Sequence, residues 1–249
     1  MTLAQLQVFE NPESVARAVA DNLTNAMAAD IDTRGECHVV LTGGTVGIAL
    51  LRFVTSTGSI DWSRVHLWWG DERFVASDSP DRNVGQASEA LINRIDIPRE
   101  NVHPIASSTE VANVEDAARR YSRDLEEFFG VDFPHFDIVL LGVGPDGHVA
   151  SLFPHLPGVT ETGLTVIPVD NSPKPPSQRV SLTLPSLNAA RRVWLVAAGR
   201  EKENAVRDAL RSIPAEDSPV SAVRGIEETI LFVDDAAASA VHVTRDATE

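Results

Sequence analysis

The stretch FDIVLLGVGPDGH, residues 136–148, decides the fold class of this chain. Residues 136–141 are mostly apolar, as expected of a short strand buried on both faces of a parallel sheet. A glycine-rich turn follows at once and carries the polar side chains of Asp146 and His148. Parallel sheets covered by helices bind their ligands beyond the carboxyl ends of the strands. This one stretch therefore predicts both an α/β fold and the position of a site.

The rest of the chain alternates short apolar runs with helical patterns. Further strands are expected at residues 6–9, 37–41, 64–69, 179–184, 193–198 and 230–233. Helices are expected after Pro12, at about 45–53, 83–95 and 114–129, and after residue 202 as far as about 213. This alternation predicts a doubly wound, mostly parallel sheet with helices on both faces. Residues 160–177 contain four prolines and are expected to form a surface loop within a single domain that spans residues 1–249.

The composition narrows the class of protein further. With 21 Lys and Arg against 36 Asp and Glu, the formal charge is −15, which disfavours nucleic acid and anionic lipid as partners. An anionic substrate would need Arg and Lys gathered locally against this charge. Cys37 is the only cysteine, no signal peptide is visible, and no apolar run approaches the roughly 20 residues of a membrane span. We therefore expect a cytoplasmic enzyme that binds neither nucleic acid nor membrane.

A glycine pair follows the expected strand at 37–41. Gly43, Gly44 and Thr45 lie between that strand and a helix. Glycines in this position let backbone N–H groups approach an anion, and the helix N-terminus favours negative charge, so the turn suits a phosphate. A tight turn without a ligand is the alternative. The turn is not a P-loop, because no Lys follows the glycines at the required place.

Charged residues mark the ends of three other expected elements. Asp71 and Arg73 follow the strand at 64–69, Arg179 begins a strand, and Lys202 precedes a helix. Arg73 is a candidate for an anion, and Asp71 for polar contacts to the substrate or within the site. The guanidinium of Arg179 can form two parallel hydrogen bonds to a phosphate, and the ammonium of Lys202 can add a point charge. Alone, the cluster at Asp71–Arg73 is equally consistent with a surface turn, and Arg179 or Lys202 alone is more often an ordinary surface residue.

The best candidate for chemistry is His148. Asp146 lies two residues earlier, close enough to hold the imidazole, and a neutral imidazole is the natural general base near neutral pH. The other histidines show no spacing typical of a metal site, and no Gly-x-Ser-x-Gly motif for a serine nucleophile occurs. The sequence therefore indicates water activated by His148, with no metal and no cofactor.

Five segments resemble the 6-phosphogluconolactonases of the glucosamine-6-phosphate deaminase/6-phosphogluconolactonase family. They are TGGT (42–45), WGDER (69–73), FDIVLLGVGPDGHVASLFP (136–154), RVSLTLP (179–185) and GREK (199–202). The resemblance implies a modified Rossmann-like sheet. It also implies hydrolysis of 6-phosphogluconolactone to 6-phosphogluconate in the oxidative pentose phosphate pathway.

The resemblance also assigns roles to individual residues. It implies that the turn at Gly43–Thr45, with Arg179 and Lys202, holds the phosphate. Arg73 would line the same pocket, and His148 with Asp146 would perform the chemistry.

Two other functions fit the same fold. Glucosamine-6-phosphate deaminases resemble this chain, but they carry Asp-Glu-Tyr where it has Asp-Glu-Arg at 71–73, and Asn-Glu-Pro after the histidine turn where it has SLFP at 151–154. A sugar-phosphate-binding regulator without catalysis is the second alternative. Such regulators normally carry a DNA-binding module, for which this chain offers no segment and the wrong charge.

Overall fold

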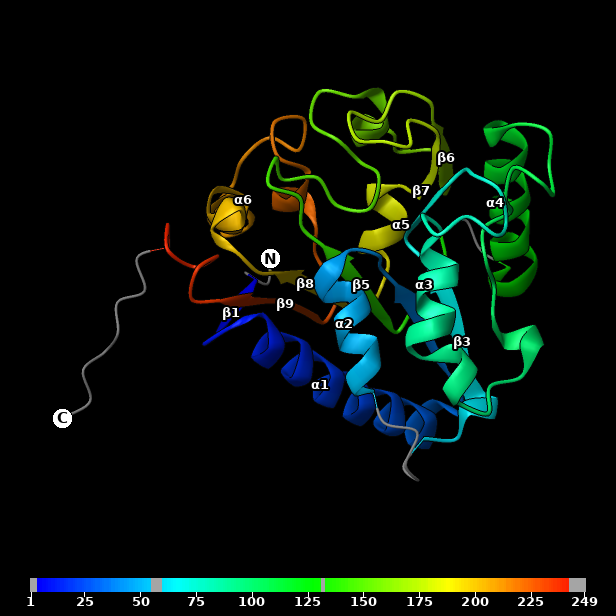
Figure 1. The fold of residues 1–249 in the computed structure, drawn as a ribbon, viewed down its shortest axis with the longest axis horizontal. Coiled ribbons are helices and arrows are strands. Elements are labelled where there is room, and N and C mark those ends of the chain that lie inside the picture. Colours follow the sequence, from blue (N-terminus) through cyan, green and yellow to red (C-terminus); the bar gives the residue numbers. More distant parts are fainter. Residues whose placement is uncertain (1–3, 55–59, 131–132, 242–249) are drawn as a thin grey trace.

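The computed structural model of the protein describes residues 4–54, 60–130 and 133–241 (Figure 1). Its main sheet has six strands in the order β1-β9-β8-β5-β2-β3, and all neighbouring strands run parallel. The strands are β1 (Gln5–Phe9), β2 (Cys37–Leu41), β3 (Val65–Trp69), β5 (Ile138–Gly142), β8 (Arg192–Ala197) and β9 (Glu228–Asp234). The predicted α/β fold with a mostly parallel sheet is confirmed.

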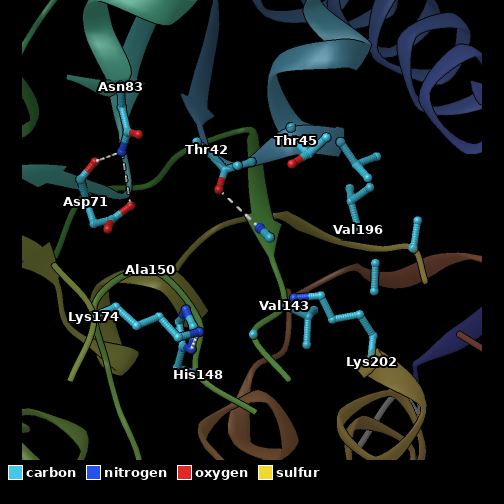
Figure 2. Close-up of a pocket in the computed structure, with 18 of the residues that line it drawn as sticks. Thr42, Thr45, Asp71, Asn83, Val143, His148, Ala150, Lys174, Val196 and Lys202 are labelled. Carbon is cyan, nitrogen blue, oxygen red and sulfur yellow. Dashed lines mark hydrogen bonds between the residues drawn. The ribbon is translucent and has the colours of Figure 1, made fainter. Parts of the chain in front are cut away.

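The order in which strands are added to the main sheet reverses between β2 and β5, although the two strands run parallel. From β2 the chain moves outward to the edge strand β3, and it then returns past β2 to place β5 on the other side. The turns after β2 and β5 therefore lead away from each other and leave a crevice at the carboxyl end of the sheet. Thr42 Oγ1 accepts a hydrogen bond of 3.1 Å from the N–H of Gly142, which holds the two turns together (Figure 2).

The first helix shows how the sequence sets its ends. In α1 (Pro12–Arg34), the side chain of Asn11 accepts a hydrogen bond from the N–H of Ser14, and Gly35 ends the helix in the left-handed conformation. One face of α1 is buried, including Val15, Val19, Leu23 and Met27. The other helices are α2 (Thr45–Phe53), α3 (Asn83–Ala90), α4 (Val114–Phe129), α5 (Leu184–Asn188) and α6 (Glu203–Ala209).

Two predicted helices are shorter in the structure. The helix expected at 83–95 ends at Ala90 and gives way to a 3-10 turn at Ile92–Arg94. The guanidinium of Arg94 donates to the carbonyl oxygen of Ala90, which satisfies an acceptor at the helix end. The last helix ends at Ala209 rather than near residue 213, because the N–H of Leu210 turns back to nearby carbonyl groups.

A second, smaller sheet departs from the prediction. Its three antiparallel strands are β4 (Asp71–Arg73), β7 (Arg179–Leu182) and β6 (Val166–Val169), in the order β4-β7-β6. Strand β6 lies inside the segment expected to be a surface loop, and this expectation was wrong for those four residues. Pro168 is tolerated because β6 is an edge strand, where one missing N–H costs little.

Buried apolar side chains connect the two sheets and the helices in one cluster. The hydroxyl of Tyr121, on α4, donates to the carbonyl oxygen of Trp69 at 3.0 Å and accepts from the N–H of the same residue at 2.9 Å. The backbone at the end of β3 is therefore fixed by α4. Within the described residues, no helix combines the length and apolar character needed to cross a membrane.

Candidate active site

A cavity of about 380 Å³ lies at the reversal of strand order, within the size range of small-molecule sites. Its walls come from the turns after β2, β5 and β8, from β4, and from the side chains of Lys174 and Arg179 (Figure 2). All the predicted site residues line this cavity except Asp146, which lies against the imidazole of His148. Residues from distant parts of the sequence thus meet in one pocket.

The turn after β2 presents the start of a helix to the cavity. Gly44 has φ 83°, a conformation that glycine adopts without strain, and α2 begins at Thr45 with no side chain capping its N-terminus. Gly43 is glycine for a different reason, because a Cβ atom there would lie 2.1 Å from Oδ1 of Asn83. The first N–H groups of α2 and the helix dipole are therefore available to an anion.

The glycines around His148 shape the turn that carries it. A Cβ atom on Gly144 would lie 1.9 Å from Nδ1 of His148, and Gly147 has φ 80°. The N–H of Gly144 also donates to the carbonyl oxygen of His148 at 2.9 Å. The imidazole packs on the ring of Phe153 with the centroids 4.6 Å apart. Only a turn with glycine at position 144 can hold the ring in this place.

Asp146 is the direct partner of His148. Its Oδ1 lies 2.5 Å from Nδ1 of the imidazole. Partial burial alone would raise the pKa of the Asp146 carboxyl, but the hydrogen bond and charge of His148 and the charge of Lys174 outweigh it. Together they hold this pKa well below its usual range. An ionised carboxylate can only accept a hydrogen bond, so Nδ1 carries the proton and Nε2 is left as the acceptor of the neutral ring.

The carboxylates of β4 hold the site together. Asp71 is buried, and its Oδ2 accepts a 2.6 Å hydrogen bond from the hydroxyl of Ser151. Glu72 accepts from the N–H groups of Arg73, Asn83 and Val84 at 2.7–2.9 Å, which fixes the start of α3. Burial raises the pKa of Glu72 despite these bonds. Of the two roles considered for Asp71, contacts within the site are present in the structure.

The two arginines of the pocket are already partly engaged. Arg179 is only 5% exposed, and its guanidinium donates to the carbonyl oxygens of Lys174, Pro175 and Pro176. Arg73 donates from one terminal nitrogen to the carbonyl oxygen of Asp81 at 2.6 Å. Its Nε atom is buried without a hydrogen-bond partner among the described residues. Arg73 therefore keeps a donor for a ligand, whereas Arg179 mainly braces the neighbouring loop.

Two lysines face the cavity. Lys202 enters from the 3-10 turn Arg200–Lys202 before α6, and burial together with the charge of Lys174 lowers the pKa of its ammonium. Lys174 was not among the sequence candidates, because it lies in the proline-rich segment expected to be a loop. Asn83 was missed as well, and its Oδ1 is buried without a hydrogen-bond partner within the described part of the chain. No local motif marks either residue.

Metal-capable side chains gather elsewhere. Within the described residues, Asp30, Cys37 and Asp137 bring three possible ligand atoms close together, at the amino ends of the strands. Asp30 is paired with Arg192 at 2.7 Å and with Arg34 at 2.5 Å. Asp137 is also paired with Arg34, at 2.8 Å. Both carboxylates are therefore committed to arginines, and the cluster lies away from His148.

The fold and the pocket define a class: an α/β protein with a helix N-terminus, two lysines and a histidine–aspartate pair at one switch point of its sheet. The family model for glucosamine-6-phosphate isomerases/6-phosphogluconolactonase matches residues 10–232, and the chain belongs to that family.

Similar proteins share one name. The 6-phosphogluconolactonase of Streptomyces coelicolor is 46% identical over 246 residues, covering 94% of each chain. That of Mycobacterium tuberculosis is 41% identical, covering 94% of this chain and 98% of its own. The crystal structure of 6-phosphogluconolactonase from Thermotoga maritima superposes with a TM-score of 0.82 at 30% identity, covering 93% of this chain and 99% of that one.

Proposed function

We propose that this protein hydrolyses 6-phospho-D-glucono-1,5-lactone to 6-phospho-D-gluconate, the second step of the oxidative pentose phosphate pathway. The observation that carries the proposal is the Asp146–His148 pair in a pocket that also presents a helix N-terminus and two lysines. The family to which the chain belongs and the names of its relatives support the same reaction.

His148 is the general base of the proposed mechanism. Its Nε2 takes a proton from a water molecule as the water oxygen bonds to the lactone carbonyl carbon. The carbonyl oxygen becomes an oxyanion, which a positively charged or N–H donor stabilises; Arg73, with its unpartnered Nε, is one candidate. The imidazolium then gives its proton to the ring oxygen as the bond from that oxygen to the carbonyl carbon breaks. Neither a metal nor a covalent intermediate enters this sequence.

The phosphate is assigned to the other part of the pocket. Gly43, Gly44 and Thr45 lead into the uncapped N-terminus of α2, and Lys202 supplies a full positive charge. Arg179 lines the cavity too, and we assign it to phosphate binding. Its contribution should be smaller than that of Lys202, because its guanidinium donates to the carbonyl groups of residues 174–176. We further propose that the acidic protein works in the cytoplasm on this small molecule, without nucleic acid as a partner.

A coupled assay tests the proposal. Lactone generated freshly from glucose 6-phosphate is added to the enzyme, and formation of 6-phosphogluconate is followed with its dehydrogenase after subtraction of spontaneous opening. Rapid, enzyme-dependent formation is expected. The same preparation is tested for ammonia release from glucosamine 6-phosphate, since the family includes both activities. Ammonia release without acceleration of lactone opening would overturn the proposal.

A further inference from the structure

Lys174 Nζ lies 3.4 Å from Nδ1 of His148 and 3.8 Å from Oδ1 of Asp146. We propose that Lys174 is a catalytic residue that binds the oxygen on C1 of the substrate, while Lys202 binds the phosphate at the other end. This inference rests on the proposed function and adds to it a direction for the substrate in the pocket. It also assigns a second charged group to the oxyanion.

The loop around Lys174 is built to hold this residue. Arg179, itself buried, donates to the carbonyl oxygens of Lys174, Pro175 and Pro176. The hydroxyl of Ser172 donates to the Lys174 carbonyl at 2.8 Å and accepts from the Lys174 N–H at 3.2 Å. The backbone at Lys174 is therefore fixed on both sides, which an ordinary surface lysine does not need. Only the four-carbon stem remains adjustable.

The ammonium of Lys174 has donors to offer a ligand. Nδ1 of His148 already gives its proton to Asp146 at 2.5 Å, so it has no lone pair for the lysine. The 3.8 Å separation from Asp146 is an ion pair and too long for a hydrogen bond. No other hydrogen bond of Nζ occurs within the described residues. The charge is thus placed beside the base while its N–H groups stay free to turn toward the substrate.

The chemistry places C1 near this lysine. A water molecule activated by His148 must bond to C1, so the oxygen on C1 has to lie within a few ångström of the same imidazole. That oxygen is neutral in the lactone, negative in the tetrahedral intermediate and part of a carboxylate in the product. A fixed ammonium therefore stabilises the intermediate more than the substrate, which is the condition for raising kcat.

The second lysine defines the opposite end. Figure 2 shows Lys202 and Lys174 entering the pocket from different walls, with His148 beside Lys174. Burial, and after it the charge of Lys174, lowers the pKa of Lys202, so the two ammonium groups repel each other across the pocket. A ligand with negative charge at both ends relieves that repulsion. 6-Phosphogluconate has this character, with a phosphate on C6 and a carboxylate on C1.

Two matched ligands distinguish binding at the C1 end of the pocket from binding at the phosphate end. 6-Phosphogluconate and D-glucitol 6-phosphate share the carbon chain and the phosphate, but the second carries CH2OH in place of the carboxylate. In calorimetric titrations, Lys174→Met should weaken the binding of 6-phosphogluconate about tenfold or more. The Kd for glucitol 6-phosphate should stay within about twofold of the wild-type value. Lys202→Met should weaken the binding of both ligands by the same factor. Equal losses for both ligands in Lys174→Met would overturn the inference.

Kinetics provide the second readout. Lys174→Met should lower kcat for the lactone at least about tenfold with KM within about twofold, and Lys174→Arg should restore part of the loss because it keeps the charge. A normal kcat in folded Lys174→Met would also overturn the inference. If Lys174→Met does not fold, Lys174→Gln is measured in the same two assays under the same criteria. Failure of the proposed function would look different, because wild-type protein would then not accelerate lactone opening at all.

Discussion

Oδ1 of Asp146 lies 2.5 Å from Nδ1 of His148, and this contact decides which ring nitrogen can act as a base. The low pKa of Asp146 keeps it ionised, so the carboxylate accepts and Nδ1 donates. Nε2 is then the only ring nitrogen of the neutral imidazole with a lone pair that can accept a proton. Gly144 makes the contact possible, since any side chain there would occupy the place of the ring.

Asp146→Asn tests this assignment. The carboxamide can turn its NH2 group toward Nδ1, which favours the tautomer with the proton on Nε2 and removes the base. We expect kcat to fall, though by less than in His148→Asn, because the other orientation of the amide still accepts from Nδ1. Steady-state kcat with the spontaneous rate subtracted measures the effect. An unchanged kcat would show that Asp146 does not orient the ring.

The close approach of Asn83 to Gly43 leads to a second prediction. Gly43→Ala should destabilise the protein by about 1–3 kcal/mol and reduce activity, because its Cβ atom would meet Oδ1 of Asn83 at 2.1 Å. Combining it with Asn83→Ala should relieve part of the loss in stability. Urea unfolding of the two single variants and the double variant measures the coupling. Strict additivity of the two losses would contradict the contact.

The sequence predicted the main sheet well because its signals are local. The strand Cys37–Leu41 coincides with its predicted bounds, and α1 begins at Pro12, where a helix was expected. The small sheet was partly missed for a physical reason. Strand β6 is stabilised by pairing with β7 rather than by its own residues, and Pro168 argues locally against a strand.

The candidate site, like the fold, could be predicted only where its residues follow a strand with a strong local signal. Residues in the segments that follow β3 and β5, such as Arg73 and His148, could be placed at the carboxyl edge of the main sheet from the sequence alone. Lys174 could not, because its position depends on the hydrogen bonds of Arg179 to the loop rather than on any nearby strand. Asn83 reaches the pocket through the contacts of Glu72 with the start of α3. The extent of the single domain over residues 1–249 stays a prediction.

A third prediction concerns acid stability and a residue that does not line the pocket. His103 stacks on Trp68 with the ring centroids 3.8 Å apart, and burial with the charges of His66 and His38 lowers the pKa of His103 to about 4. The unfolded chain therefore binds more protons between pH about 6.5 and 4, so stability present above this window is lost as the pH falls through it.

His103→Gln should flatten this dependence by about 1–2 kcal/mol, allowing for solvent screening. Urea unfolding at pH 7 and pH 5 measures the change. His155→Gln is the matched control, since the His155 side chain is 73% exposed. An equal slope in wild type and His103→Gln would contradict the prediction.

A fourth prediction is that dialysis against a chelator leaves activity intact. The proposed mechanism takes its nucleophile from water activated by His148, and the possible ligands Asp30 and Asp137 are held by arginines. The coupled lactone assay before and after dialysis gives the answer. Loss of activity that a divalent ion restores would mean that a metal, rather than the imidazole, activates the water.

The last prediction concerns His148 itself. His148→Asn keeps much of the size and polarity of the side chain but cannot accept a proton from water. As a general base His148 should contribute roughly 10²–10⁴ in rate, so kcat should fall by that factor. KM should change little, because the phosphate is assigned to the turn at Gly43–Thr45 and to Lys202 rather than to the imidazole.

Two controls make the His148 result decisive. Spontaneous opening of the lactone is subtracted, because it would otherwise hide part of the fall in kcat. Binding of 6-phosphogluconate to His148→Asn is measured as well, to establish that the pocket is intact. A folded variant that binds this ligand and keeps near-normal kcat would make His148 structural. Asp71 would then be the next base to test, although its 2.6 Å bond from Ser151 and its burial already argue against that role.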